Sequence, residues 1–179
     1  MADNNSIVTI LGLGISATLL FVFPVMTIAD RNDDVAQQSY QKATVEFVDE
    51  VCNVGSIKDA TYESYQTKLA ATGHPADVKL EVKVLDDNVG KKTTWTSSSV
   101  VGENVHYSEY TEQIESQVYG PAGEYPLKKG DIVSATATNK DTTIGQALRN
   151  GFYAMTGRGT YKIKGEHASV SKKNGSTTD

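Results

Sequence analysis

A long uncharged segment near the start of the chain most constrains how this protein can fold. From Ile7 to Ala29 the sequence reads IVTILGLGISATLLFVFPVMTIA and contains no charged side chain. As an α-helix, such a segment rises about 1.5 Å per residue and covers roughly the 30 Å hydrocarbon core of a bilayer. We therefore expect residues 1–30 to form a single transmembrane anchor, with the more polar remainder on one side of the membrane.

A cleaved signal peptide is an alternative interpretation of this segment. Signal peptides begin with a basic region and have an apolar core of about 7–15 residues. Here the preceding residues are MADNNS, which include the acidic Asp3, and the apolar run is longer. The sequence therefore favours a retained anchor over cleavage after Ala29.

Small residues within the segment allow a second alternative. The run from Gly12 to Ala17 matches the GxGxxA pattern of dinucleotide-binding folds, in which it begins an amphipathic helix of a βαβ unit. Residues 16–29 have no polar face, and no series of βαβ units follows. We instead interpret the small residues as places where another transmembrane helix can approach closely, with Pro24 as a tolerated kink. The predicted assembly interface is Gly12, Leu13, Gly14, Ser16, Leu20, Phe21, Val22 and Pro24.

Helical periodicity continues beyond the apolar segment. Apolar side chains recur at spacings of three and four, which predicts an amphipathic helix over residues 31–55 that continues from the anchor. Gly55 is in the position of a C-terminal cap. The narrow stripe can be buried either on the protein's own head or on a neighbouring helix. It comprises Ala36, Tyr40, Ala43, Phe47, Val51 and Val54.

Residues 56–169 predict an α+β head with a small antiparallel sheet packed against helices. Ser56 is expected to begin a helix that ends at residues 72–75, and Val78–Val84 alternates as a strand with one apolar face. Residues 86–90 are turn-like, and residues 92–101 are Thr/Ser-rich. A short helix is expected from Tyr107 to Val118.

The last third predicts a strand, a helix and a strand. Asp131–Thr138 alternates, and Thr142-Thr143 precedes a helix with an apolar side that Gly157 closes. The final strand is expected around residues 161–164, and residues 170–179 are expected to be a mobile tail.

The sequence contains no arrangement typical of catalysis or cofactor binding. It lacks the GxSxG and HExxH motifs, and its three histidines are far apart in sequence. The lone Cys52 fits a packed helix face better than a nucleophilic site. The formal net charge is −5 and no basic stripe is present, which argues against a nucleic-acid partner. We therefore predict a non-enzymatic protein with no cofactor, no metal and no small-molecule substrate.

The order of several short segments carries a resemblance to a known family. An apolar helix that continues into an amphipathic helix, followed by a small α+β head, resembles type IV pilin-like subunits. A closer similarity is to TadE-like pseudopilins of Gram-positive tight-adherence (Flp) pilus systems, over roughly residues 35–165. The similar segments are Phe47–Val51, Tyr62–Gly73, Asp77–Val82, Leu127–Ile132, Gln146–Arg149, Phe152-Tyr153 and Gly157.

This resemblance implies a bacterial pilus component anchored in the cell membrane, with its head outside the cytoplasm. Its partners would be the membrane and further copies or other pilin-like subunits, which it contacts through helix–helix and head contacts. The chain lacks the glutamate that pilins carry early in the apolar helix. The alternative function is a solitary cell-surface binding or adhesion module tethered by one transmembrane helix.

Overall fold

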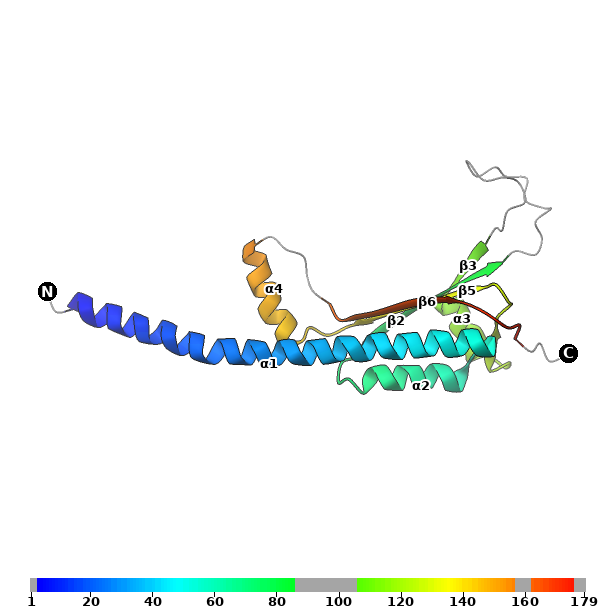
Figure 1. Cartoon of the computed structure of the whole chain (residues 1–179), viewed down its shortest axis with the longest axis horizontal. Helices are drawn as coiled ribbons and strands as arrows, with labels where there is room; N and C mark the ends of the chain where they lie inside the picture. Colours follow the sequence, from blue (N-terminus) through cyan, green and yellow to red (C-terminus); the bar gives the residue numbers. More distant parts are fainter. Residues whose placement is uncertain (1–2, 86–105, 157–161, 176–179) are drawn as a thin grey trace, which may run out of the picture. The chain divides into compact units, whose positions relative to one another are not determined.

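The computed structural model describes residues 3–85, 106–156 and 162–175 (Figure 1). The fold is α+β, as predicted, with a long N-terminal helix followed by shorter helices and antiparallel strands. The predicted turn at residues 86–90 and the segment 92–101 lie outside the described residues. The elements are α1 (Asp3–Val54), β1 (Ser56–Lys58), α2 (Asp59–Ala70), β2 (Ala76–Leu85), β3 (His106–Tyr110), α3 (Thr111–Val118), β4 (Glu124–Pro126), β5 (Ile132–Asn139), α4 (Ile144–Thr156) and β6 (Lys164–Val170).

The chain divides into two compact units, and α1 contributes residues to each. Unit 1 contains residues 1–36 and 142–162, so it combines the first part of α1 with α4. Unit 2 contains residues 37–141 and 163–179, which hold the rest of α1, α2, α3 and the strands. The domain boundaries at residues 30, 55 and 169 that the sequence suggests stay predictions.

The sheet of unit 2 has four antiparallel strands in the order β3-β2-β5-β6. Its central pair aligns Leu80 with Ala135 and Val82 with Val133, and all four side chains are buried. Most of the alternate residues on β2 and β5 are polar, and all of them are more exposed than the central pair, so the sheet buries one apolar face. The short strands β1 and β4 pair separately.

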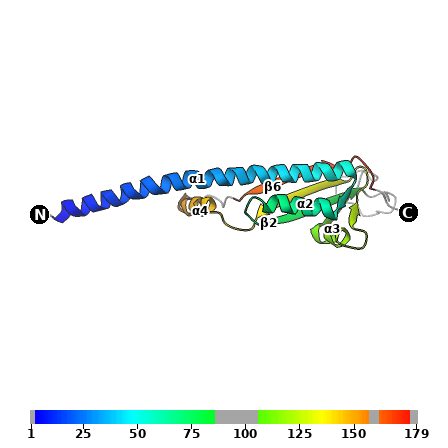
Figure 2. The same cartoon turned by 90° about the horizontal axis from the view of Figure 1, so that it is seen from below.

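Aromatic side chains form the core between the helices of unit 2, where α1 and α2 lie side by side (Figure 2). The rings of Phe47 on α1 and Tyr65 on α2 are stacked with centroids 4.4 Å apart. Tyr40 is fully buried, and its hydroxyl donates to the carbonyl of His74 at 2.9 Å. The Tyr65 and Thr44 hydroxyls are hydrogen-bonded at 2.9 Å. The amphipathic half of α1 therefore buries its stripe from Tyr40 to Val51 within the protein's own head, whereas Val54 is exposed. This burial decides between the two alternatives left open by the sequence.

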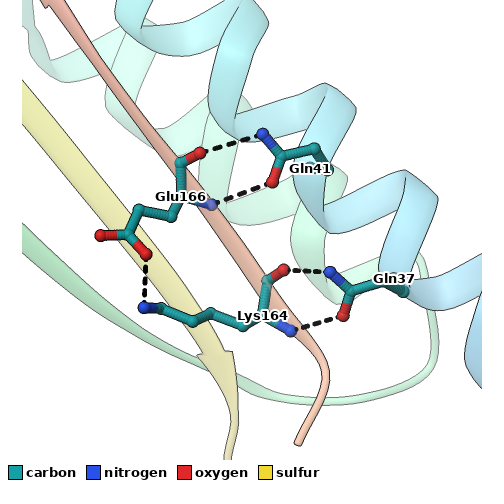
Figure 3. Close-up of polar contacts among 4 residues, drawn as sticks. All are labelled: Gln37, Gln41, Lys164 and Glu166. Atoms are coloured by element: carbon teal, nitrogen blue, oxygen red, sulfur yellow. Dashed lines mark hydrogen bonds and ion pairs between the residues drawn. The ribbon is translucent and has the colours of Figure 1, made fainter.

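Helix α1 also covers the β6 edge of the sheet (Figure 3). The side-chain amide of Gln37 bonds both the N–H and the C=O of Lys164, and that of Gln41 bonds both groups of Glu166. Residues four apart on a helix are about 6 Å apart in height, close to the two-residue repeat of a strand, so the two amides match alternate strand residues. Gly165 lies between them, where a Cβ would be 2.5 Å from the carbonyl oxygen of Tyr40.

Three predictions about local structure were correct. The strand at residues 78–84 is the main part of β2. Gly55 follows α1 with φ +89°, a conformation that favours glycine, and its N–H donates to the carbonyl of Val51. Thr143 caps α4, because its hydroxyl accepts the N–H of Gln146 at 3.0 Å.

Other local predictions were wrong. Ser56 begins the strand β1 instead of a helix, and α2 begins only at Asp59. The helix that was expected to begin at Tyr107 begins at Thr111 instead. Tyr107 and Tyr110 belong to the strand β3 and are exposed. Periodicity is ambiguous there because a strand passes into a helix within a few residues.

The C-terminal strand and tail also differ from the prediction. Strand β6 begins at Lys164 and ends at Val170, later than the pattern around residues 161–164 indicated. Beyond it, the N–H of Lys172 donates to the carbonyl of Cys52 at 3.0 Å, and the N–H of Gly175 donates to that of Leu127. Residues 171–175 are therefore tied to the head by backbone hydrogen bonds that their side chains, mostly polar, do not reveal.

Candidate assembly interface

The apolar part of α1 is exposed along its length in this chain. Leu13, Leu20 and Phe21 have 73%, 70% and 69% of their surface exposed. The helix is long and apolar enough to cross a membrane, judged by length and composition. An apolar surface of this extent is unusual on a soluble protein and is typical of a surface that another molecule or a bilayer covers.

The structure distributes the predicted interface residues over more than one face of α1. Gly12, Ser16 and Leu20 follow one another at four-residue intervals and share a face, beside which Leu13 and Pro24 also lie. Gly14 is two residues from Gly12 and therefore points to another side, which it shares with Phe21 seven residues on. Val22 lies on neither face. The eight residues thus do not form one contact patch.

A shallow apolar hollow surrounds Gly14 on its side of α1. Its volume is about 510 Å³, and a Cβ added at Gly14 would have no neighbour within 4 Å. Sequence reasoning missed most of the lining residues, although their spacing of three and four around Gly14 is the signal that would have found them. They are Ile7, Ile10, Leu11, Ile15 and Leu19.

Polar contacts hold α4 against α1 at the end of the apolar segment. The Thr143 hydroxyl donates to the carboxylate of the buried Asp33 at 2.9 Å. Arg149 makes an ion pair with Asp30 at 2.8 Å. A Cβ at Gly145 would be 2.5 Å from the Asp33 carboxylate, so glycine permits this close approach. These acidic residues, which follow the apolar run directly, therefore have partners on α4 that the sequence did not reveal.

The head of unit 2 carries a second hollow of about 500 Å³, lined by residues of α2, β2 and α3 and by Lys140. Within it the Tyr62 hydroxyl donates to the carboxylate of Glu115 at 2.7 Å. Burial raises the pKa of Tyr62 above its usual value, and the hydrogen bond to Glu115 raises it further. Tyr62 is therefore a neutral donor at physiological pH, and the hollow offers mixed polar and apolar contacts.

The residues considered for chemistry do not converge in the part of the chain that the structure describes. Cys52 is buried on α1, and burial raises the pKa of its thiol, which disfavours the reactive thiolate. His167 is hydrogen-bonded to Asp49 at 3.3 Å. Among the described residues, no group of three or more His, Cys, Asp or Glu side chains is placed to hold a metal ion.

Comparison with models of protein families, with curated proteins and with solved structures finds no match to this chain. The similarity to TadE-like pseudopilins therefore depends on the sequence segments given above.

Proposed function

We propose that this protein is a membrane-anchored, non-enzymatic structural subunit of a pilus-like surface filament. The observation that carries the proposal is the contrast between the two parts of α1. Its first part exposes apolar side chains such as Leu13 and Phe21, whereas its second part buries Tyr40 and Phe47 in the head. A helix divided in this way suits a head held at a membrane or on the core of a filament.

The anchor and the assembly surface occupy the same segment in this proposal. The apolar length from Ile7 to Ala29 supports insertion, with the head outside the cytoplasm. Gly12 and Gly14 have no side chain, and each leaves a gap on the surface of α1. These gaps support close packing of neighbouring copies or other pilin-like subunits, since van der Waals contact drives helix association in lipid. Because the two glycines face different sides, one helix can contact two neighbours, as a filament requires.

The decisive experiment compares Gly12→Ile/Gly14→Ile with Val25→Ile/Ile28→Val in the native membrane; Val25 and Ile28 are exposed and belong neither to the predicted interface nor to the hollow. Both variants keep the segment apolar and equally long, but only the first fills the gaps. Crosslinking with a cysteine at Ser16, in a Cys52→Ala background, reports neighbouring helices. We expect both variants to resist carbonate extraction and only the glycine variant to lose crosslinked oligomers.

Two results would contradict the proposal. Recovery of the unassembled protein in the soluble fraction after carbonate treatment would eliminate the anchor. Equal crosslinking of the glycine variant and the wild type would reduce α1 to a tether. The solitary surface module, with the hollow beside Tyr62 as its candidate binding surface, would then be the better function.

A further inference from the structure

Helix α4 has an apolar side that nothing in the described part of the chain covers. Ile144 is 70% exposed, and Ala147, Gly151 and Ala154 are exposed as well. These residues recur at spacings of three and four and therefore share one side of the helix. A helix in the core of a head would bury this side, so its exposure calls for an explanation.

The polar side of α4 is already used within unit 1. Arg149 bonds Asp30, and Thr143, just before the helix, bonds Asp33. Figure 1 shows α4 beginning beside α1 and running transverse to it. The apolar side is therefore directed away from the contacts that fix the helix to α1.

The chain makes a long excursion to place α4 there. Strands β5 and β6 are adjacent and antiparallel, and a two- to five-residue turn is enough to join such a pair. Instead, residues 140–163 separate them. Two hydrogen bonds between Asn139 and Ile163 close the base of this connection. The backbone N–H of Ile163 donates to the side-chain oxygen of Asn139 at 3.0 Å, and the backbone N–H of Asn139 donates to the carbonyl of Ile163 at 3.1 Å.

The attachment point coincides with the end of the apolar segment. Asp30 and Asp33 follow Ala29, its last residue, and Gly145 lies against both Ala29 and Asp33. If α1 spans a bilayer up to Ala29, α4 begins at the height of the lipid headgroups. The ion pair and the hydrogen bond also partner two carboxylates that would otherwise be partly desolvated there, at a cost in free energy.

We infer that α4 is an interfacial helix whose apolar side, including Ile144, Ala147 and Ala154, lies in the lipid surface around the anchor. The inference rests on the proposed membrane anchoring of α1 and adds a second membrane contact. A helix of this length covers about 20 Å of membrane surface, and amphipathic helices sink about 5–10 Å into the headgroup region. The occupant is lipid because α4 begins beside Ala29, the last residue of the apolar segment, and runs transverse to α1, so its exposed apolar side lies in the plane of the membrane surface.

Depth measurements on the full-length protein test this inference. Single cysteines at Ala147 and Ala154, in a Cys52→Ala background, carry nitroxide labels in phosphatidylcholine vesicles. Leu13→Cys is the reference within the span, and Val54→Cys is the matched reference on the head. Collisions with oxygen, which concentrates in lipid, are compared with collisions with a water-soluble nickel chelate. Circular dichroism confirms that each labelled protein keeps its helices.

We expect oxygen collisions to exceed nickel collisions several-fold at positions 147 and 154, as at Leu13, and the reverse at Val54. Nickel-dominated collisions at 147 and 154, with oxygen-dominated collisions at Leu13, would overturn the inference and leave the anchor intact. Exclusion of both reagents would also overturn it, because protein would then cover the helix. Nickel-dominated collisions at Leu13 would instead eliminate the proposed anchor.

Discussion

The side-chain amide of Gln41 bonds both backbone groups of Glu166, donating to its carbonyl at 2.9 Å and accepting its N–H at 3.1 Å. Gln37 does the same for Lys164 (Figure 3). An uncovered edge strand offers such groups to other chains and promotes unwanted pairing. Two glutamines of α1 therefore act as a substitute strand and join the long helix to the sheet.

Loss of this contact is expected to weaken the head measurably. Gln41→Ala removes two hydrogen bonds, each worth about 0.5–1.5 kcal/mol, so we expect the free energy of unfolding to fall by about 1–3 kcal/mol. Urea denaturation of the detergent-solubilised chain, followed by circular dichroism, measures the change. Gln38→Ala is the matched control, because Gln38 is an exposed residue of the same helix. Equal stability of the two variants would show that water replaces the Gln41 amide without loss.

Gly165 is expected to tolerate no side chain. In Gly165→Ala, the new Cβ would be 2.5 Å from the Tyr40 carbonyl oxygen and 2.7 Å from the Thr44 hydroxyl oxygen, so α1 and β6 must separate. Overpacking of this kind typically costs about 1–3 kcal/mol. Gly151→Ala serves as the control, because its Cβ would meet nothing within 4 Å, and alanine favours a helix. A Gly165→Ala protein as stable as the wild type in urea would disprove the close approach.

The apolar face of β2 is expected to carry much of the stability of the head. Leu80 is only 2% exposed and faces the helices, so Leu80→Ala leaves a cavity and is expected to cost about 2–5 kcal/mol. Lys79→Ala, on the opposite face of the same strand, is expected to change stability by less than about 0.5 kcal/mol. A loss below about 0.5 kcal/mol for Leu80→Ala would mean that this face is not a packed core.

Alkaline pH is expected to unfold the head through its buried tyrosines. Burial raises the pKa of Tyr65 from its usual 10.0 to about 12, although the hydrogen bond to Thr44 opposes the shift. Burial is also the largest cause of the raised pKa values of Tyr40 and Tyr125. The unfolded chain therefore loses its phenolic protons at lower pH than the folded chain, and ionisation favours unfolding.

This stabilisation is fully present below pH 10 and is lost as the pH rises towards 12. For Tyr65 alone it is on the order of 3 kcal/mol, since the pKa is raised from 10.0 to about 12 and one pKa unit corresponds to about 1.4 kcal/mol. A pH titration that records tyrosinate absorbance and circular dichroism together measures it. We expect Tyr65→Phe to retain more helix than the wild type at high pH. Smooth titration of every tyrosine near pH 10, with the fold intact, would contradict the prediction.

Local sequence patterns determined much of this protein. The uncharged run from Ile7 to Ala29, the apolar stripe through Tyr40 and Phe47, and the alternation around Leu80 each predicted an element that the structure contains. Such patterns succeed because each element must bury one face, and the spacing of its apolar residues records which face that is. Glycine at residue 55 was predictable for the same local reason, as the stop signal of a helix.

Tertiary structure alone decided what each face contacts. The stripe on α1 fits its own head or another helix equally well in sequence, and only the packing of Phe47 on Tyr65 decides for the head. Likewise, the sequence does not reveal the bonds from Thr143 and Arg149 to Asp33 and Asp30, which hold α4 against the first part of α1. These partners are more than a hundred residues apart, and hydrogen bonds over such separations leave no periodic trace in a sequence.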